Sequence, residues 1–222
     1  MKIIGKILKY SILKTLYFNF KYFSFFQAIK LPVLISRNVY LKEVKGKVFI
    51  KQDIKKIGRI IVGSYGVGIF DEKRSRAIWQ VSGTVVFEGK CSIGHGSKIS
   101  VAKEAILTLG NNFKITAESS IVCTKNIKIG HNCLMSWDIL MMDTDFHLIK
   151  NLKGEILNHN SSIIVEDHVW IGCRSVILKG SYIPKNSIIG AGSILSKKMV
   201  YENSLYLGAP CRFVKDEVIW EE

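Results

Sequence analysis

A chain of 222 residues is long enough for one substantial core, and its 48% of hydrophobic residues is typical of a globular protein. The net charge of +14 is uneven, because residues 1–60 hold fourteen Lys or Arg and two acids, a net charge of +12, which leaves +2 for the rest. This asymmetry indicates a basic amino-terminal element and argues against a nucleic-acid partner. Lysines interrupt that element too often for a membrane span, and it lacks the cleavage site of a signal peptide.

Residues 1–35 predict an amphipathic, basic helical segment. Between residues 3 and 20, apolar side chains recur at helical spacing, and lysines fall on the other side. Pro32 ends this region because the residue before a proline disfavours α geometry. The apolar face either packs on the rest of the protein or on a partner subunit, which we favour, or rests peripherally on an anionic membrane.

Residues 36–80 predict early strands and irregular coils that lead into a larger repeat. Short apolar runs predict strands at 39–41, 48–50 and 60–62, and a further strand at 33–35 just before this segment. A turn-rich break at 63–68 and a charged loop at 71–76 follow.

From residue 81 to about residue 200, apolar residues recur six positions apart, and a small residue often follows four positions later. The apolar positions are Phe87, Ile93 and Ile99; Leu109, Ile115 and Ile121; Ile129, Met135 and Met141; and Val165, Ile171, Ile177, Ile183, Ile189 and Leu195. This period fits a three-sided solenoid with one short strand per six residues, in which the apolar residue points inwards and the small residue lies near a corner. We therefore expect an all-β fold, a left-handed parallel β-helix.

The longest interruption of the repeat, a loop at about residues 143–163, contains the candidate catalytic histidine. Asp143 and Asp145 precede His147 at alternating positions. A carboxylate or a backbone carbonyl bound to one ring nitrogen would fix the tautomer and leave the other nitrogen as a general base. The remaining histidines are interpreted as solvated surface side chains: His95, His131, His159 and His168.

The five cysteines are odd in number and form no CxxC pair. Most lie in apolar periodic sequence, where a free cysteine behaves as a small hydrophobe. We expect reduced thiols in a cytoplasmic protein.

Three stretches resemble the hexapeptide-repeat acyltransferases, in the branch of the galactoside, maltose and xenobiotic O-acetyltransferases. They are Ile129-Gly130-His131-Asn132 through Asp143-Thr144-Asp145-Phe146-His147; Asp167-His168-Val169-Trp170-Ile171-Gly172-Cys173; and Ile189-Gly190-Ala191-Gly192-Ser193 through Ser196-Lys197, followed by Gly208-Ala209-Pro210-Cys211-Arg212. The resemblance covers about residues 81–214. The start of the chain also looks like that of polysaccharide O-acetyltransferases from bacterial glycan clusters.

The resemblance implies an acetyl-CoA-dependent O-acetyltransferase that forms a homotrimer with active sites between subunits. His147 would take the proton of an acceptor hydroxyl, which attacks the thioester directly, and the backbone N–H of Cys173 would bind the oxyanion. Trp170 would wall the channel, and Ala191 would let the pantetheine arm approach. Ser196, Lys197 and Arg212 would contact the phosphates or adenine, with residues 201–222 closing the coenzyme end.

The acceptor and the competing functions remain open at this point. A sugar hydroxyl of a capsule or O-antigen is preferred, and a free small sugar, a serine or a xenobiotic is the alternative. A metal-dependent lyase on the same scaffold is disfavoured because no second histidine lies near His147 before His159, so we expect no metal. A non-catalytic β-solenoid that binds a partner is the alternative from another class.

Overall fold

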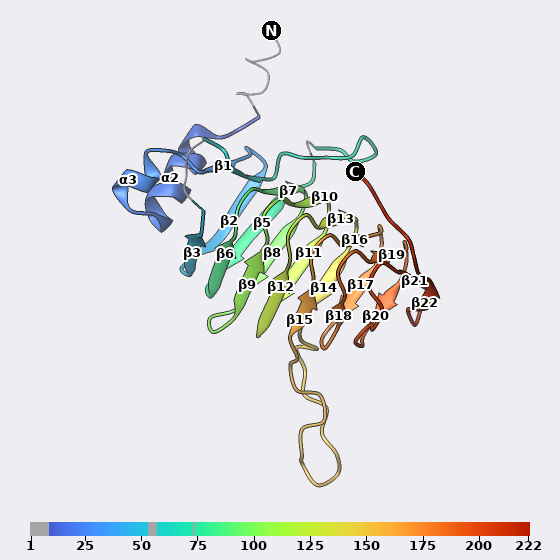
Figure 1. The fold of residues 1–222 in the computed structure, drawn as a ribbon. Coiled ribbons are helices and arrows are strands. Elements are labelled where there is room, and N and C mark those ends of the chain that lie inside the picture. The colour runs from blue at the N-terminus through green and yellow to red at the C-terminus, as the bar shows by residue number, and fades with distance from the viewer. Residues whose placement is uncertain (1–8, 53–56, 73) are drawn as a thin grey trace.

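The computed structural model describes residues 9–52, 57–72 and 74–222. The chain winds into a three-sided prism in which each turn adds one strand to each of three parallel sheets (Figure 1). This is the left-handed parallel β-helix predicted from the sequence. Strands at 33–35 and 60–62 already pair in parallel with later ones, so the coils begin earlier than the six-residue period reveals.

The first sheet contains nine strands, the last of them antiparallel: β1 (Val33–Ile35), β4 (Ile60–Val62), β7 (Cys91–His95), β10 (Phe113–Ala117), β13 (Leu134–Trp137), β16 (Trp170–Ile171), β19 (Ile188–Ile189), β21 (Leu205–Leu207) and β22 (Arg212–Lys215). The second sheet contains β2 (Val39–Val44), β5 (Ala77–Val81), β8 (Lys98–Val101), β11 (Ser120–Cys123), β14 (Leu140–Met142), β17 (Val176–Leu178) and β20 (Ile194–Leu195). The third sheet contains β3 (Lys47–Ile50), β6 (Thr84–Phe87), β9 (Ile106–Leu109), β12 (Asn126–Ile129), β15 (Ile163–Val165) and β18 (Tyr182–Ile183).

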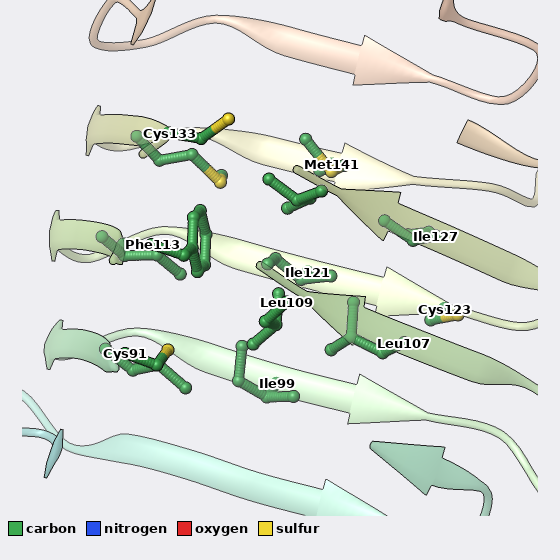
Figure 2. Packing of buried hydrophobic residues seen from close by; sticks show 14 of the residues in the cluster. Cys91, Ile99, Leu107, Leu109, Phe113, Ile121, Cys123, Ile127, Cys133 and Met141 are labelled. Atoms are coloured by element: carbon green, nitrogen blue, oxygen red, sulfur yellow. The ribbon is translucent and has the colours of Figure 1, made fainter. Parts of the chain in front are cut away.

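The core fills the prism with files of residues that occupy the same position in successive coils. All fifteen apolar positions of the six-residue series are at most 1% exposed. Figure 2 shows such files, for example Ile99, Ile121 and Met141, which pair in register on the second sheet. Each buried Ile or Leu contributes about 1.5–3 kcal/mol relative to an exposed one. The inward orientation predicted from the repeat is therefore confirmed.

Three edges join the sheets. We call the turns from the first to the second sheet the first edge, those from the second to the third the second edge, and those from the third back to the first the third edge. On the first edge, the residues Glu118, Asp138 and Arg174 adopt φ of 47°, 56° and 58°, which lets the chain turn sharply. Buried serines stand near the corners, as the sequence predicted: Ser97, Ser119, Ser175, Ser181, Ser187 and Ser193.

Two short helices, α2 (Ile12–Tyr22) and α3 (Phe25–Ala28), cover the amino-terminal end of the prism (Figure 1). Residues 3–8 of the expected helix lie outside the described residues. In α2, the buried side chains are Thr15, Phe18 and Asn19, whereas Ile12 and Leu13 are 71% and 80% exposed. The expectation that this apolar face packs on the rest of its own chain is therefore wrong, and packing on a partner subunit stays a prediction.

The physical reason is the free edge of β1, which has no earlier coil to pair with. The Asn19 amide donates to the Val33 carbonyl oxygen and accepts from the Val33 N–H, at 2.7 and 3.2 Å, and the Thr15 hydroxyl accepts from the Ile35 N–H at 3.1 Å. Polar side chains of α2 thus satisfy backbone groups that would otherwise be unpaired. None of the described helices is long and apolar enough to cross a membrane.

All five cysteines are free thiols. Burial raises the pKa of Cys123 and of Cys133 to about 12, so neither is a reactive thiolate at neutral pH. Cys173 is the one that is partly exposed.

Candidate active site

The second edge carries a long loop, residues 143–162, between β14 and β15, and it projects away from the prism (Figure 1). Asp143 at its base is fully buried. Its carboxylate accepts hydrogen bonds from the backbone N–H groups of Thr124, Lys125 and Asn126 at 2.7, 2.9 and 2.8 Å, and from the Thr124 hydroxyl at 2.9 Å. Asp143 therefore fastens the loop to the turn of the preceding coil.

Of the groups that could orient the His147 ring, Asp143 has both carboxylate oxygens engaged by the 124–126 turn. Asp145 has a different environment and is partly exposed. Its Oδ2 accepts from Lys179 Nζ at 2.5 Å and from the Asn158 amide at 2.8 Å. The hydrogen bond from Lys179 holds the pKa of the Asp145 carboxyl below its usual range.

His147 is exposed on the stem of the loop. Its backbone N–H donates to the Asp145 carbonyl at 2.7 Å, and its carbonyl accepts from the Asn158 amide at 2.8 Å. Within the described residues, neither ring nitrogen has a hydrogen-bond partner, so both are free to meet a substrate. The imidazole lines a cavity of about 510 Å³ together with Lys125, Thr144, Asn158 and Asn160.

Asn158 and Lys179 were missed by the sequence reasoning. Asn158 joins the two strands of the loop stem, because its amide binds Asp145 and His147 while its Oδ1 accepts from the Ile149 N–H at 2.6 Å. Lys179 follows β17 at the second edge, and the repeat could have placed it there, two residues after Ile177. Nothing in the sequence pattern singles out Asn158.

Cys173 and Ala191 occupy equivalent turns of successive coils on the first edge, after β16 and β19. Within the described residues, no hydrogen-bond acceptor faces the backbone N–H of either one, although the carbonyl oxygen of Cys173 accepts from the Gly192 N–H at 2.8 Å. Gly172 permits this close stacking, since a Cβ there would lie 2.6 Å from the Ala191 nitrogen. Two unpaired N–H donors on a rigid turn can bind a negatively charged oxygen or a carbonyl.

Trp170 starts β16 and is 36% exposed, with its indole N–H donating to the Ser136 hydroxyl at 3.1 Å. The carboxy-terminal segment returns alongside it, since the Trp220 ring lies 6.2 Å from that of Trp170 and stacks on His168. Trp170 is therefore a surface side chain of the first sheet rather than part of the core.

Lys197 and Arg212 are brought together at the carboxy-terminal end, where both line a cavity of about 170 Å³ with Lys198 and Tyr201. Three cations around one hollow suit phosphate groups. Ser196 is exposed at the second edge beside Lys197. Among the described residues, no group of three or more His, Cys, Asp or Glu side chains is arranged to hold a metal ion.

The predicted site residues thus fall into two groups within one chain. His147 and Asp145 lie on the second edge, and the N–H groups of Cys173 and Ala191 lie on the first edge, with the second sheet between them. One chain alone does not bring the histidine to the unpaired N–H groups.

No family model matches the chain. It is 30% identical over 149 residues to the galactoside O-acetyltransferase of Escherichia coli K12, a match that covers 65% of this chain and 69% of that protein. It is 28% identical over 125 residues to the polysialic acid O-acetyltransferase of Neisseria meningitidis, and there it spans about half of the relative, 56% of each chain. The crystal structure of the polysialic-acid-specific acetyltransferase NeuO has the same fold, with a TM-score of 0.53 and 21% identity over 86% of this chain and 79% of that one.

Proposed function

The chain belongs to the hexapeptide-repeat O-acetyltransferases and is an acyltransferase, and from this premise we propose that it moves an acetyl group from acetyl-CoA to a sugar hydroxyl of a bacterial surface polysaccharide. The observation that carries the coenzyme assignment is the pair of unpaired N–H groups at Cys173 and Ala191. The hollow with Lys197 and Arg212 lies beyond them towards the carboxy terminus, where a phosphate-bearing coenzyme end fits. The relative from Neisseria meningitidis is named for polysialic acid, which is an acidic polysaccharide. This name supports a polysaccharide acceptor for the present chain.

In the proposed reaction, a free ring nitrogen of His147 takes the proton from the acceptor hydroxyl as its oxygen attacks the thioester carbonyl carbon. The N–H of Cys173 donates to the oxyanion of the tetrahedral intermediate. The carbon–sulfur bond then breaks, the thiolate of coenzyme A leaves, and the histidine returns the proton to it. Asp145, Lys179 and Asn158 hold the loop stem, so they position His147 rather than touch the substrate.

We place the active site between subunits of a homotrimer, because one chain keeps its two groups on different edges. The loop supplies a second argument. Its apolar side chains are largely uncovered by the described residues, since Phe146, Leu148 and Leu157 are 67%, 64% and 62% exposed. An exposed apolar patch of this kind marks an interaction surface, and a neighbouring prism would bury it.

We also propose that the enzyme works at the inner face of the membrane and that residues 1–35 hold it there. Leu13, Phe26 and Ile12 project from α2 and α3 with exposures of 80%, 77% and 71%. Exposed lysines flank them, and no acid precedes Glu43 in the sequence. Apolar side chains with a basic surround fit an anionic lipid surface.

Vesicle sedimentation tests this membrane contact. The double variant Leu13→Ser, Phe26→Ser should bind vesicles of phosphatidylglycerol and phosphatidylcholine at least about tenfold more weakly, because each apolar side chain contributes about 1.5–3 kcal/mol when buried. The control is Ile219→Ser, which changes an equally exposed residue far along the chain. Equal sedimentation of the double variant and the wild type would remove the proposal.

Titration calorimetry of acetyl-CoA tests the enzymatic proposal first, with wild type and His147→Ala compared. Micromolar binding by both proteins is expected, followed by thiol release with a sugar acceptor in the wild type alone. If neither protein binds acetyl-CoA, the acetyltransferase proposal fails and the binding-solenoid alternative moves forward.

A further inference from the structure

His95 was expected to be a solvated surface side chain, and the structure contradicts this. It ends β7 on the first edge and is only 2% exposed. The short irregular segment around Tyr65 and Gly66 covers it, since the His95 N–H donates to the Tyr65 carbonyl at 2.6 Å and a Cβ at Gly66 would lie 3.0 Å from Nδ1. The Phe70 ring packs edge-on to the imidazole at 5.7 Å.

Neither ring nitrogen of His95 has a hydrogen-bond partner within the described residues. The Glu118 Oε1 atom is 3.9 Å from Nε2, and the same carboxylate accepts from Lys98 at 3.3 Å through Oε2. Unpaired buried polar atoms are costly and therefore rare, and they concentrate where a protein binds something.

A cavity of about 400 Å³ opens beside His95. Three successive turns of the first edge form its wall: Ser36, Arg37 and Asn38; Gly63 and Ser64; and His95. This size is within the range of small-molecule pockets. Hydroxyl and amide groups on two of the turns are the donors and acceptors that bind sugars.

The charge of the cavity favours an anion. Lys9 and Glu72 on the rim lie 3.6 Å apart and neutralise one another. Arg37 remains, and its exposed guanidinium has no partner within the described chain. A free guanidinium fits a carboxylate because two parallel N–H donors match its two oxygens.

This cavity lies on the same edge of the prism as the proposed site of acetyl transfer. His95 and Cys173 lie on the same edge, and the strands β7, β10, β13 and β16 separate their coils by three steps. At about 4.8 Å per step, His95 lies roughly 14 Å along the edge from the unpaired N–H of Cys173, and Arg37, two coils further away, lies roughly 24 Å from it. Lys197 and Arg212 lie on the carboxy-terminal side of Cys173, so the coenzyme takes that side and the rest of the acceptor extends towards His95.

We propose that this cavity, resting on the proposed transferase function, is a distal acceptor subsite that binds the carboxylate of an acidic sugar residue. Arg37 binds the carboxylate, and the side chains of Ser36, Asn38 and Ser64 hydrogen-bond to the same sugar, while buried His95 forms part of the wall. The acceptor is then an acidic oligosaccharide that runs along the first edge, with the acetylated hydroxyl a few residues from the bound one. A single sugar does not reach both places.

The test is titration calorimetry with trigalacturonate, an acidic trisaccharide, and maltotriose, a neutral one. Arg37→Ala is compared with the control Lys42→Ala, which removes an exposed cation on β2 away from the cavity. Both variants alter an exposed residue, and thermal unfolding checks that both are folded. Acetyl-CoA is titrated into every sample.

Trigalacturonate should bind the wild type at least tenfold more tightly than maltotriose, and Arg37→Ala should abolish the difference while Lys42→Ala keeps it. Acetyl-CoA binding should be unchanged throughout. If acetyl-CoA binds but trigalacturonate shows no preference, or Arg37→Ala retains it, the subsite is overturned and the transferase proposal stands. If acetyl-CoA fails to bind the wild type, the transferase proposal fails, and an Arg37-dependent site would then have no part in acetyl transfer.

Discussion

The first and second edges of the prism are built from the same coils but offer opposite kinds of chemistry. On the first edge, tight turns stack one on another and leave backbone N–H groups of Cys173 and Ala191 unpaired. On the second edge, the chain departs from the repeat and presents His147 on a loop held by Asp143. Stacked, regular turns hold a backbone N–H donor in a fixed position. A general base must be a side chain that can reach the substrate, and a loop can present one.

In the proposed mechanism, neither edge suffices alone. The turns at Cys173 and Ala191 would supply the oxyanion donors, and the loop would supply His147 as the base. A site that combines them would need the first edge of one prism beside the second edge of another. The following variants break one edge at a time.

Removal of the base should have the largest effect. His147→Ala should lower kcat by about 10²–10⁴, because general-base catalysis supplies that factor. The KM for acetyl-CoA should stay near the wild-type value, since the proposal assigns coenzyme binding to the first edge and not to the loop. Steady-state thiol release measures both constants, and Lys153→Ala, an exposed residue of the same loop outside the cavity, is the control. A kcat for His147→Ala within threefold of wild type would rule out His147 as the base.

The substitution Cys173→Pro tests the oxyanion donor on the first edge. Arg174 has φ of 58° and Cys173 is not in the left-handed region, which is the pattern of a type II turn, and proline is favoured at its first central position. Because the Cys173 N–H makes no hydrogen bond to any described residue, proline should remove the donor with little damage to the fold. The loss of one oxyanion donor predicts a fall in kcat of about 10²–10³.

The control for that variant is Cys173→Ser, which keeps the backbone donor and should retain most of the activity. If Cys173→Ser is as inactive as Cys173→Pro, the thiol and not the N–H is the working group. Thermal unfolding of both variants separates a chemical effect from a folding defect.

Mixing the two inactive variants tests whether the edges meet between subunits. If they do, mixed trimers of His147→Ala and Cys173→Pro contain some sites with both native groups, about a quarter when subunits assort at random. Unfolding and refolding the variants together should therefore recover activity, measured by thiol release. Activity no higher than that of the separate variants would mean that each site lies within one chain.

The β-helix could be predicted from the sequence because every coil requires an apolar residue at the same inward position. Ile171, Ile177 and Ile183 each follow the previous inward position by six residues. Each strand therefore gives a further, matching indication of the same fold. The amino-terminal cap was not predictable in the same way. Thr15 and Asn19 are buried because the first strand lacks a neighbour, and that condition exists only once the prism is assembled.

The residues of the candidate site were also predictable only in part. The place of His147 in an extruded loop followed from the break in the period, but the partners of Asp143 did not. They lie in the turn of the preceding coil, and only the stacking of coils brings residues 124–126 against the carboxylate. His95 was interpreted wrongly for the same reason, since the segment that covers it belongs to the preceding coil.

Asp143 should therefore be a stability residue that affects catalysis indirectly. Asp143→Ala leaves three backbone N–H groups without an acceptor and should lower the free energy of unfolding by about 3 kcal/mol, which corresponds to a fall in Tm of about 6–12 °C. Differential scanning calorimetry measures this change. Asp145→Asn on the same loop is the comparison, since that exposed carboxylate should alter Tm much less. Equal effects would mean that Asp143 does not anchor the loop.

The smallest expected effect concerns the pH range over which the loop stem holds. Lys179 lowers the pKa of Asp145, so the bond from the Asn158 amide is present above the ordinary carboxyl pKa and is lost only as the pH falls through the lowered value. In Lys179→Met, the carboxylate should protonate at a higher pH, and the bond should be lost earlier during acidification. An NMR titration of the Asn158 side-chain amide follows this directly, with Lys150→Met as a control on the same loop. An unchanged midpoint in Lys179→Met would show that the ion pair does not tune Asp145, and the stem of the second edge would then depend on Asn158 alone.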